Sequence, residues 1–189
     1  ITRSEMSVDE ELLTELRHLA TVARGCSHGR AVHDSSPDSD DTAWTSVGDP
    51  MEAAIDSLAR QLSDHPNDIE AGVDAATISR FPFDPRRRRS SVVTIDRVLV
   101  KGAPDAVIGR CVGAPQAAFD QVLHEMSDRG LRVLAVAERS WPGTPPTTVD
   151  EAESDLTLLG LLGFEDPPRA EAHDALTACR LAGIKLSLI

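Results

Sequence analysis

The sequence contains no tyrosine, and only 3% of its 189 residues are aromatic. Proteins that hold single-stranded nucleic acid stack its bases on aromatic side chains, and proteins that hold polynucleotides neutralise phosphates with a basic surface. Here 31 acidic residues outnumber 19 basic ones, which leaves a formal net charge of −12. The composition argues against a nucleic-acid partner and against an anionic membrane surface. It still allows one small anion in a local basic pocket.

Cysteines and long apolar runs are also scarce. The three cysteines form no CxxC pair, which disfavours a disulfide framework and favours a reducing compartment. The best apolar run, at residues 156–164, is shorter than the roughly 18 to 20 residues that span a bilayer. The chain begins at Ile1 with no basic and apolar leader, so we expect it to be part of a longer protein.

Several common motifs of catalysis and cofactor binding are missing. The sequence has no GxxxxGK[ST] or GxGxxG phosphate loop and no HExxH zinc helix. Cys26, His28 and His33 lie close together, but they have no second ligand cluster, so a zinc site is disfavoured. Acidic pairs are too frequent in this composition to identify a site.

Hydrophobic periodicity predicts an α/β chain of the α+β kind, with an antiparallel sheet flanked by helices. Helices are predicted over residues 7–25, 49–66, 104–110, 115–130 and 170–182. Strands are predicted over 76–83, 90–95, 97–102, 131–140, 156–164 and 184–189, with a hairpin at 90–102. Residues 27–47 are predicted to form a long surface loop, and 140–154 a proline-rich connector. The last strand, turn, helix and strand indicate half of a parallel α/β unit.

Two basic features are candidates for anion binding. Arg86–Arg89 is the one basic cluster, and in a strand its side chains alternate between two faces, so two of them can point into a pocket. The alternative is a solvated edge strand that charge protects from aggregation. Lys101 ends a predicted strand beside Gly102, in a chain with two lysines and 17 arginines. That usage suggests a need for a compact ammonium group, although chance usage explains it too.

Five segments together carry a family resemblance. They are GDPMEAA at 48–54, FPFD followed by RRRRSSVV at 81–93, VKGAPD at 100–105, GLRVLAVA at 130–137 and GFEDPPR at 163–169. In this order they resemble the nucleotide-binding (N) domain of P-type ATPases, most of all cation pumps of the calcium-transporting type, here with a bacterial-looking composition. The resemblance covers nearly the whole chain, and five ordered motifs are far more specific than any one of them.

The resemblance implies ATP as the ligand. It gives Phe83 the role of stacking on adenine, where the alternative is an ordinary core phenylalanine. It implies that Glu52 lies near the adenine end, where the alternative is a first-turn helix glutamate. Other roles follow the same motifs: Lys101 as the pocket lysine, Gly102 as room for the ring, Arg132 as a triphosphate contact, and Leu134 as packing on the other side of the nucleotide, where the alternative is plain core. Some pumps have arginine where Pro85 stands, and Arg86 is expected to substitute for it.

The resemblance also shows what is missing. In the family an Asp-Lys-Thr-Gly-Thr loop takes the γ-phosphate, and a later lysine and Mg²⁺-binding carboxylates assist it; none of these is in this sequence. We therefore expect residues 1–164 to be a nucleotide-binding domain. Residues 165–189 are expected to be a hinge, with Asp166 and Arg169, and a partial βαβ segment of the HAD-like phosphorylation domain. The isolated chain is not expected to catalyse phosphoryl transfer.

The implied setting is the cytoplasmic part of an integral plasma-membrane pump. Its partners there are the phosphorylation, actuator and membrane domains, and this chain itself is expected to touch no membrane. Two other functions remain open at this point. Met51, Pro85 and the acidic loop fit a non-catalytic interaction module of the same fold that has lost nucleotide binding. The terminal α/β unit suggests a self-contained haloacid-dehalogenase-type hydrolase, which the absence of the nucleophile loop disfavours.

Overall fold

The computed structural model describes residues 10–33, 44–63, 76–166 and 171–187. The helices in these ranges are α1 (Glu10–Gly25), α2 (Pro50–Leu62), α4 (Pro104–Ile108), α5 (Gln116–Asp128), α6 (Val149–Ala152) and α7 (Ala172–Leu181). The strands are β1 (Arg30–His33), β2 (Trp44–Val47), β3 (Thr77–Asp84), β4 (Arg89–Thr94), β5 (Arg97–Gly102), β6 (Arg132–Ser140) and β7 (Thr157–Phe164). None of the helices in the described ranges is long and apolar enough to cross a membrane.

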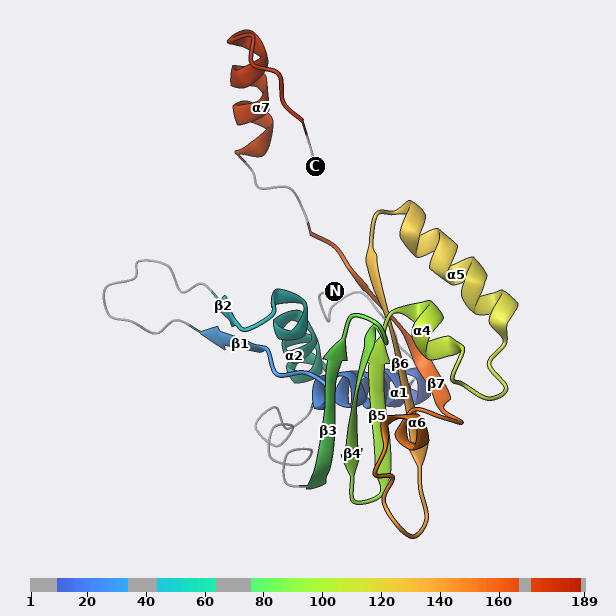
Figure 1. Ribbon diagram of the computed structural model, residues 1–189. Helices are drawn as coiled ribbons and strands as arrows, with labels where there is room; N and C mark the ends of the chain where they lie inside the picture. Colours follow the sequence, from blue (N-terminus) through green and yellow to red (C-terminus); the bar gives the residue numbers. More distant parts are fainter. Residues whose placement is uncertain (1–9, 34–43, 64–75, 167–170, 188–189) are drawn as a thin grey trace.

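Five strands form one antiparallel sheet in the order β3-β4-β5-β6-β7, which is also their order along the chain (Figure 1). Antiparallel neighbours can be joined by tight turns, and only Ile95 and Asp96 separate β4 from β5. The predicted hairpin at 90–102 is confirmed, and so is the mixed architecture of an antiparallel sheet with flanking helices.

Helices cover both faces of the sheet, because successive residues of a strand point to opposite sides. The core on the first face joins α1 and α2 to the sheet through Leu19, Val22, Ala23, Cys26, Ile55, Val92, Leu99 and Val136. The core on the second face joins α4 and α6 to it through Val93, Val98, Val100, Val107, Ile108, Ala135, Ala137, Ala152 and Leu156. The central strands are apolar on both faces for this reason, and the small aromatic share leaves the core mostly aliphatic.

The start of α2 is fixed by its own sequence. Asp49 is the N-cap, and its carboxylate accepts hydrogen bonds from the backbone amides of Met51 (2.8 Å) and Glu52 (3.2 Å). Pro50 occupies the first turn, where its missing N–H costs nothing. The predicted helix at 49–66 is thereby confirmed up to Leu62. The predicted start of the first helix, at residue 7, lies outside the described residues.

The prediction of a surface loop over 27–47 is wrong at both of its ends. β1 and β2 pair as an antiparallel ribbon, with Arg30 opposite Val47 and His33 opposite Trp44. The two rings of the last pair meet edge to face, with centroids 5.5 Å apart. The polar composition suggested a loop, but backbone pairing satisfies the N–H and C=O groups of such short segments equally well. The acidic residues 34–43 lie outside the described residues.

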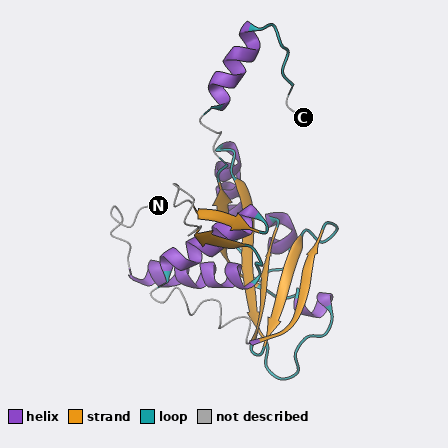
Figure 2. Ribbon diagram, turned by 90° about the vertical axis from the view of Figure 1, so that its left-hand side faces the viewer, coloured by secondary structure: helices purple, strands orange, loops and turns teal. Residues whose placement is uncertain are grey.

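The end of the chain also differs from the prediction. β7 pairs antiparallel with β6 at the edge of the sheet, and most of its residues are half-buried rather than buried. Residues 184–187, predicted to begin a final strand, form none, because no strand lies beside them in the described part of the chain. α7 has no buried residue and stands beyond the end of the sheet in both views (Figure 1, Figure 2). The boundary between 164 and 165 stays a prediction.

One short helix was not predicted. α6 lies inside the proline-rich segment 140–154 and begins with a capping box. The Thr148 side chain accepts a hydrogen bond from the Glu151 amide, while the Glu151 carboxylate accepts one from the Thr148 amide. The Thr-x-x-Glu spacing is the sequence signal for this helix start.

Candidate functional site

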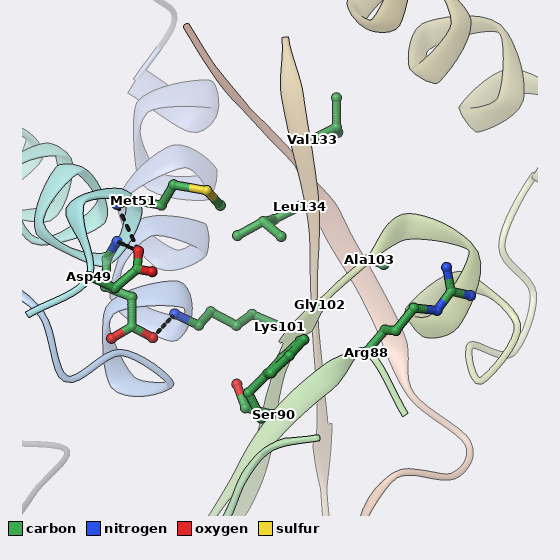
Figure 3. Close-up of a pocket in the computed structure, with 11 residues that line it drawn as sticks. Asp49, Met51, Arg88, Ser90, Lys101, Gly102, Ala103, Val133 and Leu134 are labelled. Atoms are coloured by element: carbon green, nitrogen blue, oxygen red, sulfur yellow. Dashed lines mark hydrogen bonds and ion pairs between the residues drawn. The ribbon is translucent and has the colours of Figure 1, made fainter. Parts of the chain in front are cut away.

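A pocket of about 480 Å³ opens where the ends of the central strands meet the start of α2 (Figure 3). Its volume falls in the range of about 300 to 1,000 Å³ that is typical of small-molecule sites. The lining residues are Asp49, Met51, Glu52, Phe83, Arg88, Ser90, Lys101, Gly102, Ala103, Val133 and Leu134. Five of the residues predicted from sequence are among them: Glu52, Phe83, Lys101, Gly102 and Leu134.

Lys101 lies near the end of β5 with only 6% of its surface exposed. Its ammonium group donates to the Glu52 carboxylate (2.6 Å) and to the Ser27 hydroxyl (2.6 Å). A dashed line from Lys101 in Figure 3 marks one of its interactions. The Ser27 hydroxyl in turn donates to the Ala23 carbonyl at 2.8 Å. A buried ammonium needs such partners, because burial without them is costly. Lys101 is therefore a fixed positive charge in the pocket wall.

The Glu52 carboxylate connects this lysine to the chain before β1. Its second oxygen accepts from the backbone amides of His28 (2.8 Å) and Gly29 (2.9 Å). Burial by itself raises the pKa of Glu52, but the hydrogen bonds from Lys101 and from these two amides outweigh it and hold the pKa below its usual value. Glu52 is thus an ionised residue that joins Lys101 to the backbone before β1. This role is additional to that of a glutamate in the first turn of a helix.

Cys26 is buried beneath this cluster and packs with the core on the α1 and α2 face. Burial raises the pKa of its thiol to about 12, and the nearby Lys101 charge offsets only part of that effect. A thiol with such a pKa is protonated at neutral pH and is a poor nucleophile or metal ligand. Cys26 is a small core residue.

Phe83 has 63% of its surface exposed and lines the pocket, so the core interpretation does not apply to it. Phe81, two residues earlier, packs against the core of the second face. Strand alternation alone would place both rings on one side. The register of β3 against β4 shifts between Phe81 and Asp84, however, and this irregularity separates the two rings.

Gly102 lines the pocket, and the structure gives a second reason for a glycine there. A Cβ atom at this position would collide with the side chain of Arg89 and come within 2.6 Å of the Arg88 carbonyl oxygen. The Arg88 carbonyl accepts a hydrogen bond from the Ala103 amide at 2.9 Å. The missing side chain therefore lets the β3–β4 turn pack onto the end of β5.

Two apolar side chains, from α2 and β6, complete the pocket wall. Met51 extends from α2 and Leu134 from β6, and Figure 3 shows both beside the aliphatic stem of Lys101. Leu134 also packs against the core between the sheet and the helices α1 and α2. The alternative interpretation of Leu134 as a core residue therefore holds for part of its side chain. The pocket thus offers an apolar slot next to one fixed cation.

Most of the arginine run lies in a turn, so the strand alternation considered for its side chains does not apply. Residues 85–88 make a turn, and only Arg89 belongs to β4. The Asp84 carboxylate accepts from the amides of Arg86 (2.7 Å) and Arg87 (3.3 Å), and Pro85 sits at the first turn position. The Asp-Pro pair was the sequence signal for this turn.

Arg88, rather than Arg86, is the member of the run that lines the pocket. It lies across the pocket from Asp49 and Met51 in Figure 3, and its guanidinium pairs with Asp105 at the start of α4. Both side chains are more than half exposed, and exposed pairs of this kind are worth about 0 to 1 kcal/mol. Arg88 is free to exchange Asp105 for a bound anion. Asp49 and Ser90 also line the pocket, and Ser27 holds Lys101 from outside the lining; the sequence analysis assigned none of these three to the site.

The other predicted residues lie elsewhere. Arg132 is the exposed first residue of β6 and does not line the pocket, although it lies two residues from Leu134. Asp166 is exposed beyond the end of β7, and Arg169 lies outside the described residues. Within the described ranges, no three histidine, cysteine or acidic side chains are placed to hold a metal ion.

The arrangement suits a ligand with a flat apolar part and a negative part. Aromatic and aliphatic groups can sandwich a planar ring, and Lys101 and Arg88 can offset negative charge. The lining is therefore suited to binding such a ligand.

Comparison with known proteins yields a family match. The family model described as "P-type ATPase, cytoplasmic domain N" matches residues 15–171. A calcium-transporting ATPase of Bacillus subtilis is 31% identical over 178 residues, which cover 85% of this chain and 20% of that protein. A probable cation-transporting ATPase F of Mycobacterium tuberculosis is 30% identical, with 85% of this chain and 19% of that protein covered.

A relative with another stated cargo appears as well. A sodium/potassium-exporting P-type ATPase of Schizosaccharomyces pombe is 28% identical over 166 residues, covering 77% of this chain and 15% of that protein. The chain thus spans about a fifth or less of the length of these curated relatives.

Proposed function

The chain belongs to the family of P-type ATPase cytoplasmic N domains, and we propose from this premise that its pocket binds ATP. The observation that carries the proposal is the meeting of an exposed aromatic ring, Phe83, and a buried cation, Lys101, in one pocket of nucleotide size. An adenine ring fits between Phe83 and the apolar pair formed by Met51 and Leu134. Base stacking of this kind supplies about 1 to 3 kcal/mol per base.

The polar residues divide between holding the pocket and holding the phosphates. Glu52 fixes Lys101, whose remaining hydrogen-bonding capacity is directed to the nucleotide. Arg88 is the turn residue that we expect at the phosphates, in the place given to Arg86 on sequence grounds. The planar guanidinium suits phosphate oxygens, because two of its N–H groups can donate at once. Arg132 is a further phosphate contact in this proposal, reached from the exposed end of β6.

The wider setting is likewise proposed. Residues 1–164 are the nucleotide-binding domain of a cation-transporting ATPase, and residues 165–189 are the hinge and the beginning of its phosphorylation domain. ATP supplies the phosphoryl group that such a pump transfers, with Mg²⁺ held by groups outside this chain. Asp166 and Arg169 are the hinge residues, and a swing there carries the bound nucleotide toward the phosphorylation domain. The actuator and membrane domains are further partners, in the plasma membrane. The relatives are named for different transported ions, so no ion is proposed.

Titration of the chain with ATP, followed by amide NMR, tests the proposal. Resonances near Phe83, Lys101 and Arg132 should shift, with little dependence on Mg²⁺, because the chain lacks the family's Mg²⁺ carboxylates. If none of these resonances moves, the proposal is wrong and the interaction module without nucleotide binding becomes the better interpretation. Binding of a fluorescent ATP analogue that ATP displaces would exclude that alternative.

A further inference from the structure

Glu153 is a fully buried carboxylate outside the pocket. It follows α6, and 0% of its surface is exposed. Three donors surround it: the Arg87 guanidinium, the Arg89 guanidinium (2.6 Å) and the Ser91 hydroxyl (2.8 Å). A buried charge persists only when it is paired and hydrogen-bonded to this degree. The cluster therefore acts as one rigid unit.

The two arginines reach from Glu153 to both sides of the β3–β4 turn. Arg87 also donates to the carbonyl of Pro82 at 2.6 Å, directly before Phe83. Arg89 also donates to the carbonyl of Arg87 at 3.1 Å, directly before Arg88. The carboxylate thus connects, through one arginine each, to the backbone next to both residues that the turn contributes to the pocket.

The turn needs an external support. Arg88 has a φ of 53°, in the left-handed region that non-glycine residues seldom occupy. Its carbonyl faces Gly102 and accepts from the Ala103 amide, so this conformation also sets the contact between the turn and β5. An arginine is held in that conformation only where neighbouring groups fix the backbone on either side.

We propose that Glu153 is a positioning residue for nucleotide binding: through Arg87 and Arg89 it holds the turn that presents Phe83 and Arg88 to the pocket. The inference rests on the proposed ATP binding, because it names a residue that prepares the same pocket. Glu153 itself touches neither the pocket nor its ligand, since it is not among the lining residues. Its effect on affinity is therefore indirect.

Glu153→Gln is the test, because it keeps the shape and removes the charge. The matched control is Glu138→Gln on β6, four residues along the strand from Leu134. The Glu138 carboxylate accepts hydrogen bonds from Arg97 (3.1 Å) and His18 (2.8 Å). ATP dissociation constants are measured by calorimetry on protein whose folded fraction is known from thermal unfolding. Glu153→Gln should weaken ATP binding about tenfold, the order expected when one charge-assisted contact is lost. Glu138→Gln should leave the constant unchanged.

A double-mutant cycle separates positioning from general stabilisation. If Glu153 acts through Arg88, then Glu153→Gln should weaken binding clearly less in an Arg88→Gln background than in the unmutated chain. A carboxylate that only stabilises the fold would lower the melting temperature and leave the affinity of the folded protein unchanged. That result overturns the proposal. Full additivity of the Arg88 and Glu153 effects on affinity also overturns it, if the hydrogen-exchange rate of the Ala103 amide is unchanged as well.

Hydrogen exchange keeps the inference independent of ATP. The Ala103 amide, bonded to the Arg88 carbonyl, should exchange at least about tenfold faster in Glu153→Gln and at an unchanged rate in Glu138→Gln. If the unmutated chain binds no ATP, the proposed function fails, and this exchange rate alone decides whether Glu153 holds the turn. Should Glu153→Gln not fold, Ser91→Ala removes one donor and keeps the charge; it should change exchange in the same direction by a smaller factor, and no change refutes the inference.

Discussion

Phe83 and Phe81 lie two residues apart on β3. Replacing each of them by leucine separates an effect on ATP binding from an effect on the stability of the fold. Phe83→Leu keeps apolar bulk and removes the aromatic face. Since 63% of Phe83 is exposed, we expect the free energy of unfolding to change by no more than about 0.5 kcal/mol. Stacking on a base is worth about 1 to 3 kcal/mol, and leucine retains part of the contact, so the loss should be about 1 kcal/mol, or about fivefold in the ATP dissociation constant.

Phe81→Leu is the control, because that ring packs against the core of the second face. It should lower the free energy of unfolding by about 1 kcal/mol and leave the ATP constant within error. Urea unfolding measures the first quantity, and calorimetric titration with ATP and with adenosine measures the second. Phe83→Leu should weaken both ligands alike, since the ring contacts the base. Unchanged affinity in Phe83→Leu, or equal losses in both variants, would refute the assignment of Phe83 to the base.

The other predictions concern charge and protonation. Arg88→Gln should weaken ATP about tenfold and adenosine hardly at all, whereas Arg86→Gln should change neither; calorimetry compares them, and the reverse order would restore Arg86 to the site. Hydrogen bonds from Lys101 and two amides, acting against burial, hold the pKa of Glu52 below its ordinary 4.5, so its stabilising effect is full above that pH and is lost as the pH falls through the lower folded pKa. Glu52→Gln should therefore lower the free energy of unfolding near neutral pH and reduce its decrease in acid. Urea unfolding across this pH range measures both, and a steeper decrease in the variant would contradict the prediction. Because burial raises the pKa of Cys26 to about 12, iodoacetamide at about pH 8 should spare it in the folded chain and modify it after unfolding, as mass spectrometry can show.

The elements that the sequence predicted well are those with a local signal. The start of α2 follows from Asp49 and Pro50, and the hairpin at 90–102 follows from two β-branched runs separated by one polar residue. The edge position of β7 carries no such signal. Its run of leucines and glycines is equally typical of a buried parallel strand, and only the partner strand, β6, decides between the two.

Within the site, single residues were easier to predict than their surroundings. Phe83 and Lys101 were identified by their motifs, and both line the pocket. The family resemblance pointed to Arg86, next to Pro85, whereas Asp84 and Pro85 make a turn that brings Arg88 to the pocket lining. Ser27 and Glu153 have no local signature, because each acquires its role from a side chain more than sixty residues away in the chain.

The long separations between these partners also bear on how the domain folds. Lys101 meets Ser27 across 74 residues and Glu52 across 49, and Glu153 meets Arg89 across 64. Contacts so distant in sequence form late and slowly, because much of the chain must be ordered before any of them is made. The pocket cannot exist in a half-folded intermediate. A ligand that binds only the complete pocket will therefore stabilise the whole sheet and raise its melting temperature. The size of this thermal shift reports how much of the protein is completely folded.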